Sequence, residues 1–480
     1  MLALLTLAAA TALVWTAVLL RRGGLAAGCL LVLVAGVCFG PPFFHQSIGP
    51  LPISLDRLIW AALVAWCLMA RLAGAACSRP LARSDYVLAA FFLVIVVNVL
   101  AFDFRAGGGL PVSQLVFYHV LPLGLYWVAR QARYSSRIVL GMLAGWALFG
   151  VYLSLTAIAE AGGLDWLIYP KYIASPEYPE FLGRARGPLL NPSGSGILQG
   201  LCLAAAAVLW PSAGRRGKLA LGGICLVMLA GIYSTLTRSA WIGAGLTLIG
   251  VCALAIPRRL RVPAVLGCLL VAVFAGATQW ERLISFKRDR ALTAEDVADS
   301  ARLRPILAMV AWEMFQDRPL AGCGLGHYMD AHTQYLNQRP WGMPLEKAGP
   351  FIQHNVVLAY LVELGLVGAG LYIIVLSLWL RDAWRLWRTP DAPLWTGQYA
   401  LFYLAFLVNY LVNGMFHDVT LIPMVNMIVY FLAGMTVSLR QETEALVDGH
   451  SRAAVTPQSR WLGKREAGNH NQASGQWLRA

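Results

Sequence analysis

Long apolar runs separated by short polar links occupy most of this 480-residue chain. The hydrocarbon core of a bilayer is about 30 Å thick, so a helix needs about 20 apolar residues to cross it. About thirteen runs approach that length, covering residues 2–20, 25–40, 54–71, 85–101, 112–129, 137–158, 194–211, 218–234, 240–256, 262–279, 356–380, 397–414 and 421–439. The pattern predicts an all-α polytopic membrane protein with about 12 or 13 transmembrane helices.

Two longer polar segments interrupt the apolar runs, at residues 159–193 and 280–355. Within the second, apolar residues recur three and four positions apart over residues 300–318, which predicts an amphipathic helix lying along the membrane surface. We therefore expect amino-terminal transmembrane helices over residues 1–158 and a membrane domain with two loops over 159–439. The polar residues 440–480 show no periodicity, which predicts a disordered tail.

Composition supports the membrane assignment. The chain is 58% hydrophobic and only 13% charged, whereas soluble domains are about 25% charged. The net charge of +14 is distributed in short clusters between apolar runs, which is typical of membrane topology and disfavours nucleic-acid binding. Most of the nine cysteines lie inside apolar runs, so no disulfide framework is indicated.

The distribution of basic residues predicts the orientation of the chain. Six alternate links together hold seventeen Lys and Arg residues, whereas the short links on the other side hold three, Arg57, Arg105 and Arg238. By the positive-inside rule the first set is cytoplasmic, together with the tail, and both long loops lie outside. Nucleotide-activated sugars are absent from that side, so a group transfer there requires a donor that is already activated and held in the membrane.

Three arginines near outer helix ends are candidate anion ligands. Arg184 and Arg186 lie just before the run that begins at 194, and Arg238 lies among hydroxyl residues between two apolar runs. Guanidinium groups beside helix amino termini form good anion sites. The alternatives are that Arg184 and Arg186 extend to lipid headgroups, and that Arg238 pairs with backbone carbonyls or a distant acid.

His354 is the candidate base, because imidazole titrates near neutral pH and can accept a proton from a hydroxyl group. It stands at the outer mouth of an apolar run, next to Asn355. A zinc site formed with His327 and His332 is an alternative, but their spacing is poor and no clear carboxylate or Cys set completes it.

One motif resembles a known family. His354-Asn355 is followed, after nine residues, by Gly365-Leu366-Val367-Gly368. This is similar to the signature of the O-antigen ligase and O-antigen polymerase superfamily of bacterial membrane glycosyltransferases, which includes the protein O-oligosaccharyltransferases. The similarity extends over about residues 180–435, and its other elements are Arg186-Gly187, Asn191-Pro192, Thr237-Arg238-Ser239-Ala240-Trp241, Arg302, Pro319-Leu320 and Tyr328.

The resemblance implies a membrane glycosyltransferase of the C-type fold, with a periplasmic loop over a cavity open to lipid. Its donor would be a glycan on a polyprenyl pyrophosphate, and its acceptor a lipid core, a glycan or a protein. Arg186 and Arg238 would bind pyrophosphate, and His354 would act as base or position the acceptor. Arg302, Arg184, Asn355 and Tyr328 are the further expected substrate contacts, and no metal or cofactor is implied.

Three functions remain open at this stage. A ligase transfers a whole glycan to an acceptor, a polymerase extends a glycan on its own carrier, and a transporter performs no chemistry. The His354 motif favours a ligase, and the outer position of the arginines disfavours transport. The expected location is the bacterial inner membrane, with the active site on the periplasmic side.

Overall fold

The structure is a computed structural model that describes residues 24–48, 51–74, 79–102, 111–255, 294–390 and 392–455, with a few isolated residues between 259 and 270. It is an all-α polytopic membrane protein, as the hydropathy predicted. Seven of the described helices are long and apolar enough to cross a membrane. Eleven of the thirteen predicted runs coincide with described helices, while residues 2–20 and most of 262–279 fall in the parts of the chain that are not described.

The helices of the bundle follow the apolar runs closely. They are Gly24–Phe39, α2 (Leu55–Leu72), α3 (Arg83–Ala101), α4 (Pro111–Gln114), the π-helical turn η1 (Leu115–Val120), α5 (Leu121–Gln131), α6 (Ser136–Ala161), α7 (Pro192–Leu209), α8 (Arg215–Ser234), α9 (Arg238–Ala255), α14 (Val356–Arg388), α15 (Leu394–Gly414) and α16 (Pro423–Val455). A hairpin of β1 (His45–Ile48) and β2 (Leu51–Ser54) precedes α2.

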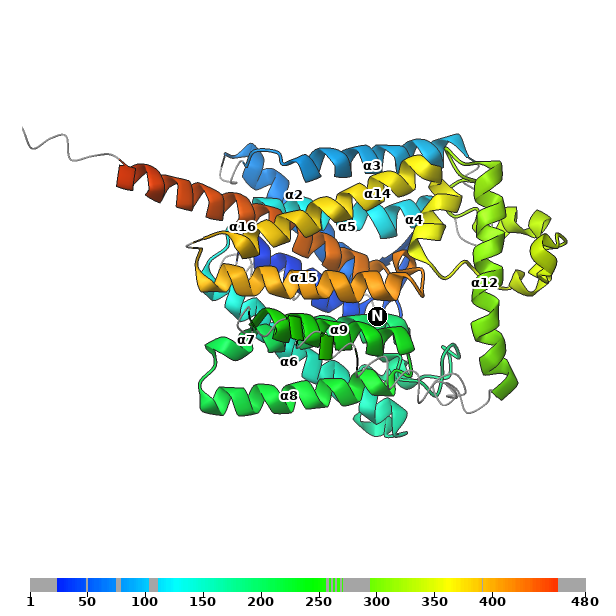
Figure 1. Cartoon of the computed structure of the whole chain (residues 1–480), viewed down its shortest axis with the longest axis horizontal. Helices are drawn as coiled ribbons and strands as arrows, with labels where there is room; N and C mark the ends of the chain where they lie inside the picture. Colours follow the sequence, from blue (N-terminus) through cyan, green and yellow to red (C-terminus); the bar gives the residue numbers. More distant parts are fainter. Residues whose placement is uncertain are drawn as a thin grey trace, which may run out of the picture.

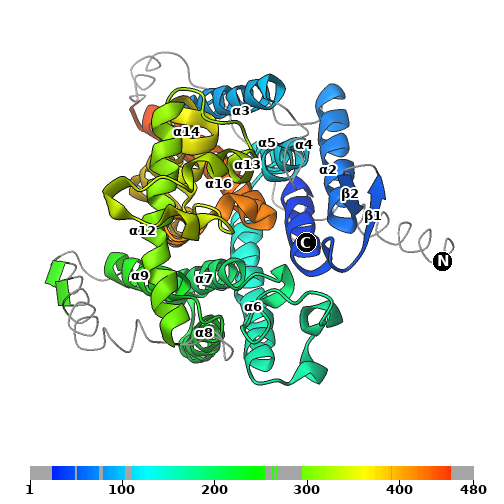
Figure 2. The same ribbon diagram turned by 90° about the vertical axis from the view of Figure 1, so that its right-hand side faces the viewer.

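The long helices lie side by side, and α12 (Ala294–Asp317) crosses one end of the bundle almost at right angles to them (Figure 1). We call this end the lid end, and the segment from α12 to Gln353 the lid. The lid has its own apolar core, formed by one face of α12 and by residues such as Tyr328, Leu345 and Ala348. Viewed from this end, α12 passes in front of α7 and α9 (Figure 2).

The opposite end is held by charged side chains from three helices. Arg130 of α5 pairs with Asp85 of α3 at 2.8 Å, and Arg79 pairs with Glu442 of α16 at 2.6 Å. These arginines belong to, or lie beside, the basic links that the sequence places in the cytoplasm. The ion pairs fix α16 against α3 and α5.

One local feature differs from expectation. Helix α16 runs to Val455, so residues 440–455 are helical where the sequence predicted a disordered tail.

Helix α7 is capped by Asn191, whose side chain accepts a hydrogen bond from the Gly194 amide at 3.0 Å. Asn191 is a strong capping residue and stands just before Pro192, which is favoured at the first helical position.

The glycine motif after His354 marks a break in α14, where the lid joins the bundle. Gly365 has φ +66° and ψ −168°, so the backbone leaves the helical conformation there. The chain at Pro319–Gly324 enters this break: the Leu366 amide donates to Pro319 O at 2.7 Å, and Cys323 and Gly324 donate to carbonyls of α14 at 2.8 and 3.0 Å. Asn98 of α3 completes the junction by donating to Ala321 O and accepting from the Leu325 amide.

Replacement of Gly365 is expected to separate the lid from the bundle. A Cβ atom at this position would lie 2.3 Å from the Leu320 carbonyl, and the positive φ is unfavourable for any other residue. We expect Gly365→Ala to lower the thermal unfolding midpoint by several degrees and to expose the lid to protease. Gly370→Ala is the matched control, because space is open around Gly370 in the same helix. Equal stability of the two variants would contradict this account.

Candidate functional site

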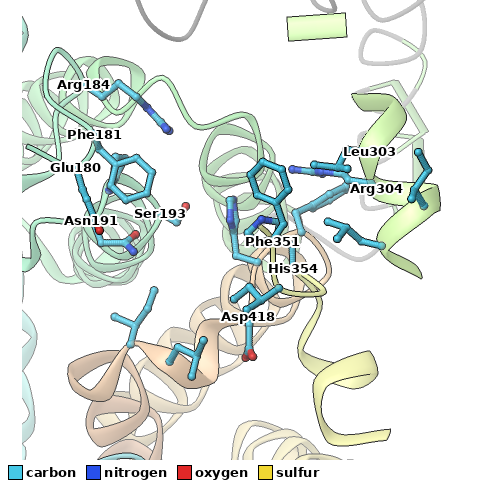
Figure 3. A pocket seen from close by; sticks show the side chains of 18 of the residues that line it. Glu180, Phe181, Arg184, Asn191, Ser193, Leu303, Arg304, Phe351, His354 and Asp418 are labelled. Atoms are coloured by element: carbon cyan, nitrogen blue, oxygen red, sulfur yellow. The ribbon is translucent and has the colours of Figure 1, made fainter. Parts of the chain in front are cut away.

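A cavity of about 760 Å³ lies under the lid, where segments from five parts of the chain meet. We call it the pocket. Residues 180–184 and 191–193 form one side, α12 forms the other, and residues 351–354 and 416–422 lie between them. Figure 3 shows this arrangement, with Arg184, Asn191 and Ser193 on one side, Arg304 on the other, and Phe351 and His354 between them.

His354 lines the pocket on a strained piece of backbone. Its φ is +49°, a left-handed conformation that histidine adopts more readily than most residues. Phe181, which also lines the pocket, has φ +59°, and Leu190, next to Asn191, has φ +52°. Strained residues of this kind cluster at functional sites because the surrounding structure must hold them in place.

Asn355 lies next to His354 and caps α14. Its side-chain oxygen accepts hydrogen bonds from the Val357 and Leu358 amides at 2.9 and 3.1 Å, and its amide donates to Met415 O at 3.1 Å. These bonds occupy both ends of the side chain, and Asn355 is not among the residues that line the pocket. Asn355 therefore fixes where α14 begins and how His354 is presented.

Two guanidinium groups from separate segments, Arg184 and Arg304, line the pocket. Arg184 donates to Thr237 Oγ1 at 2.8 Å and to Thr235 O, which joins it to the turn that leads into Arg238. Burial and the positive charge of Arg238 together lower the pKa of Arg304. Arg304 lines the pocket with its guanidinium 5.0 Å from the ring centroid of Phe416. The positive charges of Arg238 and Arg304 oppose each other, and a bound anion would relieve this repulsion.

His354 is affected by the positive charge of Arg304. Burial, and to a lesser extent the charge of Arg304, lower the pKa of His354 below its usual 6.5. The imidazole is therefore neutral at pH 7 and able to accept a proton.

Asp418 is a pocket residue that the sequence analysis did not select. Burial raises the pKa of its carboxyl group to about 6. The carboxylate accepts hydrogen bonds from the Thr420 amide at 3.1 Å, from the Thr420 hydroxyl, and from the Gln353 side chain at 3.4 Å. It thus ties the loop after α15 to the residue that precedes His354. The sequence shows Asp418 as a lone acid beside His417 at the end of an apolar run. This position could have indicated a functional role, because acids within or at the edge of a membrane are usually functional.

The structure does not bring Arg186 to the pocket. Its side chain is completely buried within the loop between α6 and α7, and its Nε lies 3.4 Å from Glu160. Its other hydrogen bonds go to backbone carbonyls of the same loop, at Ile173, Ser175, Tyr178 and Glu180. In this arrangement Arg186 holds the loop that presents Glu180, Phe181 and Arg184 to the pocket.

Replacing Arg186 is therefore expected to reduce stability. Arg186→Ala would leave Glu160 buried without its partner, which costs about 3–5 kcal/mol in buried ion pairs. Arg186→Lys should recover only part of this loss, because an ammonium group cannot satisfy several carbonyls arranged around a planar fork. Thermal unfolding followed by size-exclusion chromatography measures the effect. An Arg186→Ala protein with wild-type stability would show that the loop does not depend on this side chain.

The remaining predicted residues lie elsewhere. Tyr328 is buried in the lid core, stacked on His332 at 5.2 Å between ring centroids, and does not line the pocket. Arg302 belongs to α12, but its side chain is not among those described. His332 is bonded through both ring nitrogens to the carbonyls of Met329 and Gly349. Over the described part of the chain, no group of three or more His, Cys, Asp and Glu side chains is arranged to hold a metal ion.

The fold and the pocket together define a polytopic membrane protein with a cationic pocket and a histidine at one end of its helix bundle. In a comparison with protein families, residues 223–373 match the model described as O-Antigen ligase, which supports the resemblance to the O-antigen ligase superfamily. The matched segment contains Arg238, α12, the lid and the His354 motif. Comparison with curated proteins gives no match.

Proposed function

We propose that this protein transfers a glycan from a polyprenyl-pyrophosphate carrier to a hydroxyl group of an acceptor, at the periplasmic face of the bacterial inner membrane. Residues 159–439 would form the transferase domain. The observation that carries the proposal is that Arg184, Arg304 and a neutral imidazole, His354, line one pocket, with Arg184 bonded to the turn that leads into Arg238. The family match supports a membrane role in glycan transfer or polymerisation.

The proposed chemistry assigns the arginines to the leaving group. Pyrophosphate is already a good leaving group, so neutralising its developing charge matters more than protonating it. Arg304 and Arg238 would face the phosphates, with Arg184 on the opposite side of the pocket. Like-charged guanidinium groups that repel each other when the pocket is empty bind a dianion more strongly than a single arginine does.

His354 is assigned to the acceptor. The acceptor oxygen forms a bond to the anomeric carbon while the bond from that carbon to the phosphate oxygen breaks. The electron pair of the broken bond leaves with the pyrophosphate, and the hydroxyl proton passes to His354. Direct attack inverts the anomeric centre, and no metal ion is required in this scheme.

The test uses the purified protein in nanodiscs with a lipid-linked glycan and candidate acceptors. A product in which the glycan is attached to the acceptor supports a ligase. Extension of the lipid-linked glycan without an acceptor supports a polymerase, which would use the same pocket. If neither product forms and the glycan crosses the membrane of a sealed vesicle, the protein is a transporter and the proposal is wrong.

The pH dependence follows from Asp418 and His354. The carboxyl group of Asp418 is ionised above its pKa of about 6, and His354 is neutral above a pKa lower than 6.5. Both are in the required form at pH 7, and transfer is expected to fall as the pH drops from 7 to 5. Asp418→Asn should lower transfer at pH 7 and make the acid side of the profile less steep. An unchanged profile in this variant would remove Asp418 from the mechanism.

A further inference from the structure

A second cavity, of about 220 Å³, lies beside the pocket. It is bounded by the helix Gly24–Phe39, the first turn of α2, η1, the residues before α7 and the start of α16. Three of its lining residues, Asn191, Leu421 and Ile422, also line the pocket. The two cavities therefore adjoin each other at these three residues.

The second cavity contains a carboxylate, a guanidinium group and an aromatic ring. Asp56 is 4% exposed, and the Ser54 hydroxyl donates to its Oδ1 at 2.5 Å. The guanidinium of Arg57 lies 3.6 Å from the ring centroid of Phe117 and donates to Pro52 O. The rest of the lining is mostly apolar, with residues such as Leu189 and Met427. An acid buried in such surroundings is costly, and one that lines a cavity is a candidate ligand-binding residue.

The loop after α15 also connects the two cavities, because its residues Leu421 and Ile422 line both of them. Asp418 lines the pocket and is bonded to the residue that precedes His354. The charged groups of the second cavity therefore lie behind the proposed reaction centre, and not on a remote surface.

We propose that the second cavity binds a single sugar ring of a glycan whose neighbouring unit occupies the pocket. The inference rests on the proposed function. At about 220 Å³ the cavity is smaller than the roughly 300–1,000 Å³ of pockets for drug-sized ligands, so it takes a small unit. A sugar ring offers hydroxyl donors to Asp56, hydroxyl acceptors to Arg57 and an apolar face to Phe117. The ring belongs either to the donor glycan or to the acceptor, and both present the same chemistry.

Kinetics of Asp56→Asn distinguish the two sources. The amide is isosteric and keeps an acceptor for the Ser54 hydroxyl, but it loses the charge that strengthens hydrogen bonds to sugar hydroxyls. We expect KM to rise about 10-fold for the substrate that carries the bound sugar, with kcat and the other KM within about twofold of wild type. A change in the donor KM assigns the ring to the donor glycan, and a change in the acceptor KM assigns it to the acceptor. Asp165→Asn, an exposed acid in the first outer loop, is the control.

A binding experiment separates this inference from the proposed function. The probes are two free oligosaccharides, one released by mild acid from the lipid-linked donor and one prepared from the acceptor glycan. Saturation-transfer NMR with the wild-type protein should show contact with one of them, and Asp56→Asn should lose most of that signal. Binding that depends on Asp56, without any transfer in the kinetic assay, would contradict the proposed reaction but support the sugar site.

Two results would overturn the sugar site. One is the absence of contact with either oligosaccharide in the wild-type protein, and the other is an Asp56→Asn variant with wild-type KM values and wild-type NMR contact. If Asp56→Asn unfolds at a lower temperature than the control, Phe117→Leu provides the second test. It removes the aromatic ring together with its contact to the Arg57 guanidinium, while Asp56 keeps its charge, and the same rise in one KM is expected.

Discussion

Replacing His354 by Gln is expected to lower kcat for glycan transfer by about 10²–10⁴-fold, the usual contribution of a general base. Glutamine can still form hydrogen bonds, but it cannot accept the proton of the acceptor hydroxyl. The pKa of His354 lies below 6.5 because the ring is half-buried and Arg304 is nearby. The wild-type imidazole is therefore available as a base throughout the neutral range. Initial rates with saturating donor and acceptor measure the loss.

The control for this prediction is His45→Gln, an exposed histidine in the β-hairpin that bonds to Pro41 O. It should retain wild-type transfer. A His354→Gln enzyme that turns over normally, with an unchanged pH profile, would exclude His354 as the base. A loss confined to the acceptor KM would instead show that His354 only positions the acceptor, which is the other role that the family resemblance allows.

Replacing Arg304 by Gln is expected to reduce kcat/KM by about 10²–10³-fold, the typical effect of losing one preorganised charge-stabilising group. In the absence of added substrate, the same change should leave the protein as stable as wild type, or more stable. The charges of Arg238 and Arg304 repel each other, and removal of one charge relieves that repulsion. Lower activity together with unchanged or higher stability is the result that a purely structural arginine would not give.

Arg339→Gln is the matched control for Arg304. Arg339 lies in the lid and pairs with Glu346 at 2.8 Å, but both side chains are about half exposed, so the pair contributes little. We expect wild-type transfer and stability in this variant. A large stability loss in Arg304→Gln, with Arg304→Lys fully active, would mean that the guanidinium supports α12 and does not bind pyrophosphate. Arg238→Gln should behave like Arg304→Gln if the two arginines share one anion.

The position of Arg304 illustrates what the sequence could and could not predict. The amphipathic helix was readable because apolar residues recur at helical spacing, and the structure has α12 there. Which of its arginines enters the pocket depends on how the helix is rotated about its axis. That rotation is set by the lid core, through contacts with residues about 20 to 50 positions further along the chain, such as Tyr328 and Ala348.

Arg184 and Arg186 also show that the sequence does not specify which side chain enters the pocket. Both stand before α7, and the one nearer the helix was the stronger prediction. In the structure Arg186 turns inward to Glu160 and the loop carbonyls, while Arg184 reaches the pocket. Neighbouring residues in irregular backbone point in directions that periodicity does not specify, so the choice between them required the folded loop.

The sequence by itself determined the class of the protein, the course of most helices and the His354 motif, because a bilayer imposes a length and a polarity that each segment shows locally. Only the tertiary structure decided which charged groups face one another. It bonded Asp418 to Gln353, the residue that precedes His354, and brought the positive charge of Arg238 near Arg304. It also buried Arg186 outside the pocket. These relations depend on contacts between residues about 25 to 65 positions apart, whose energies arise only when the segments pack together.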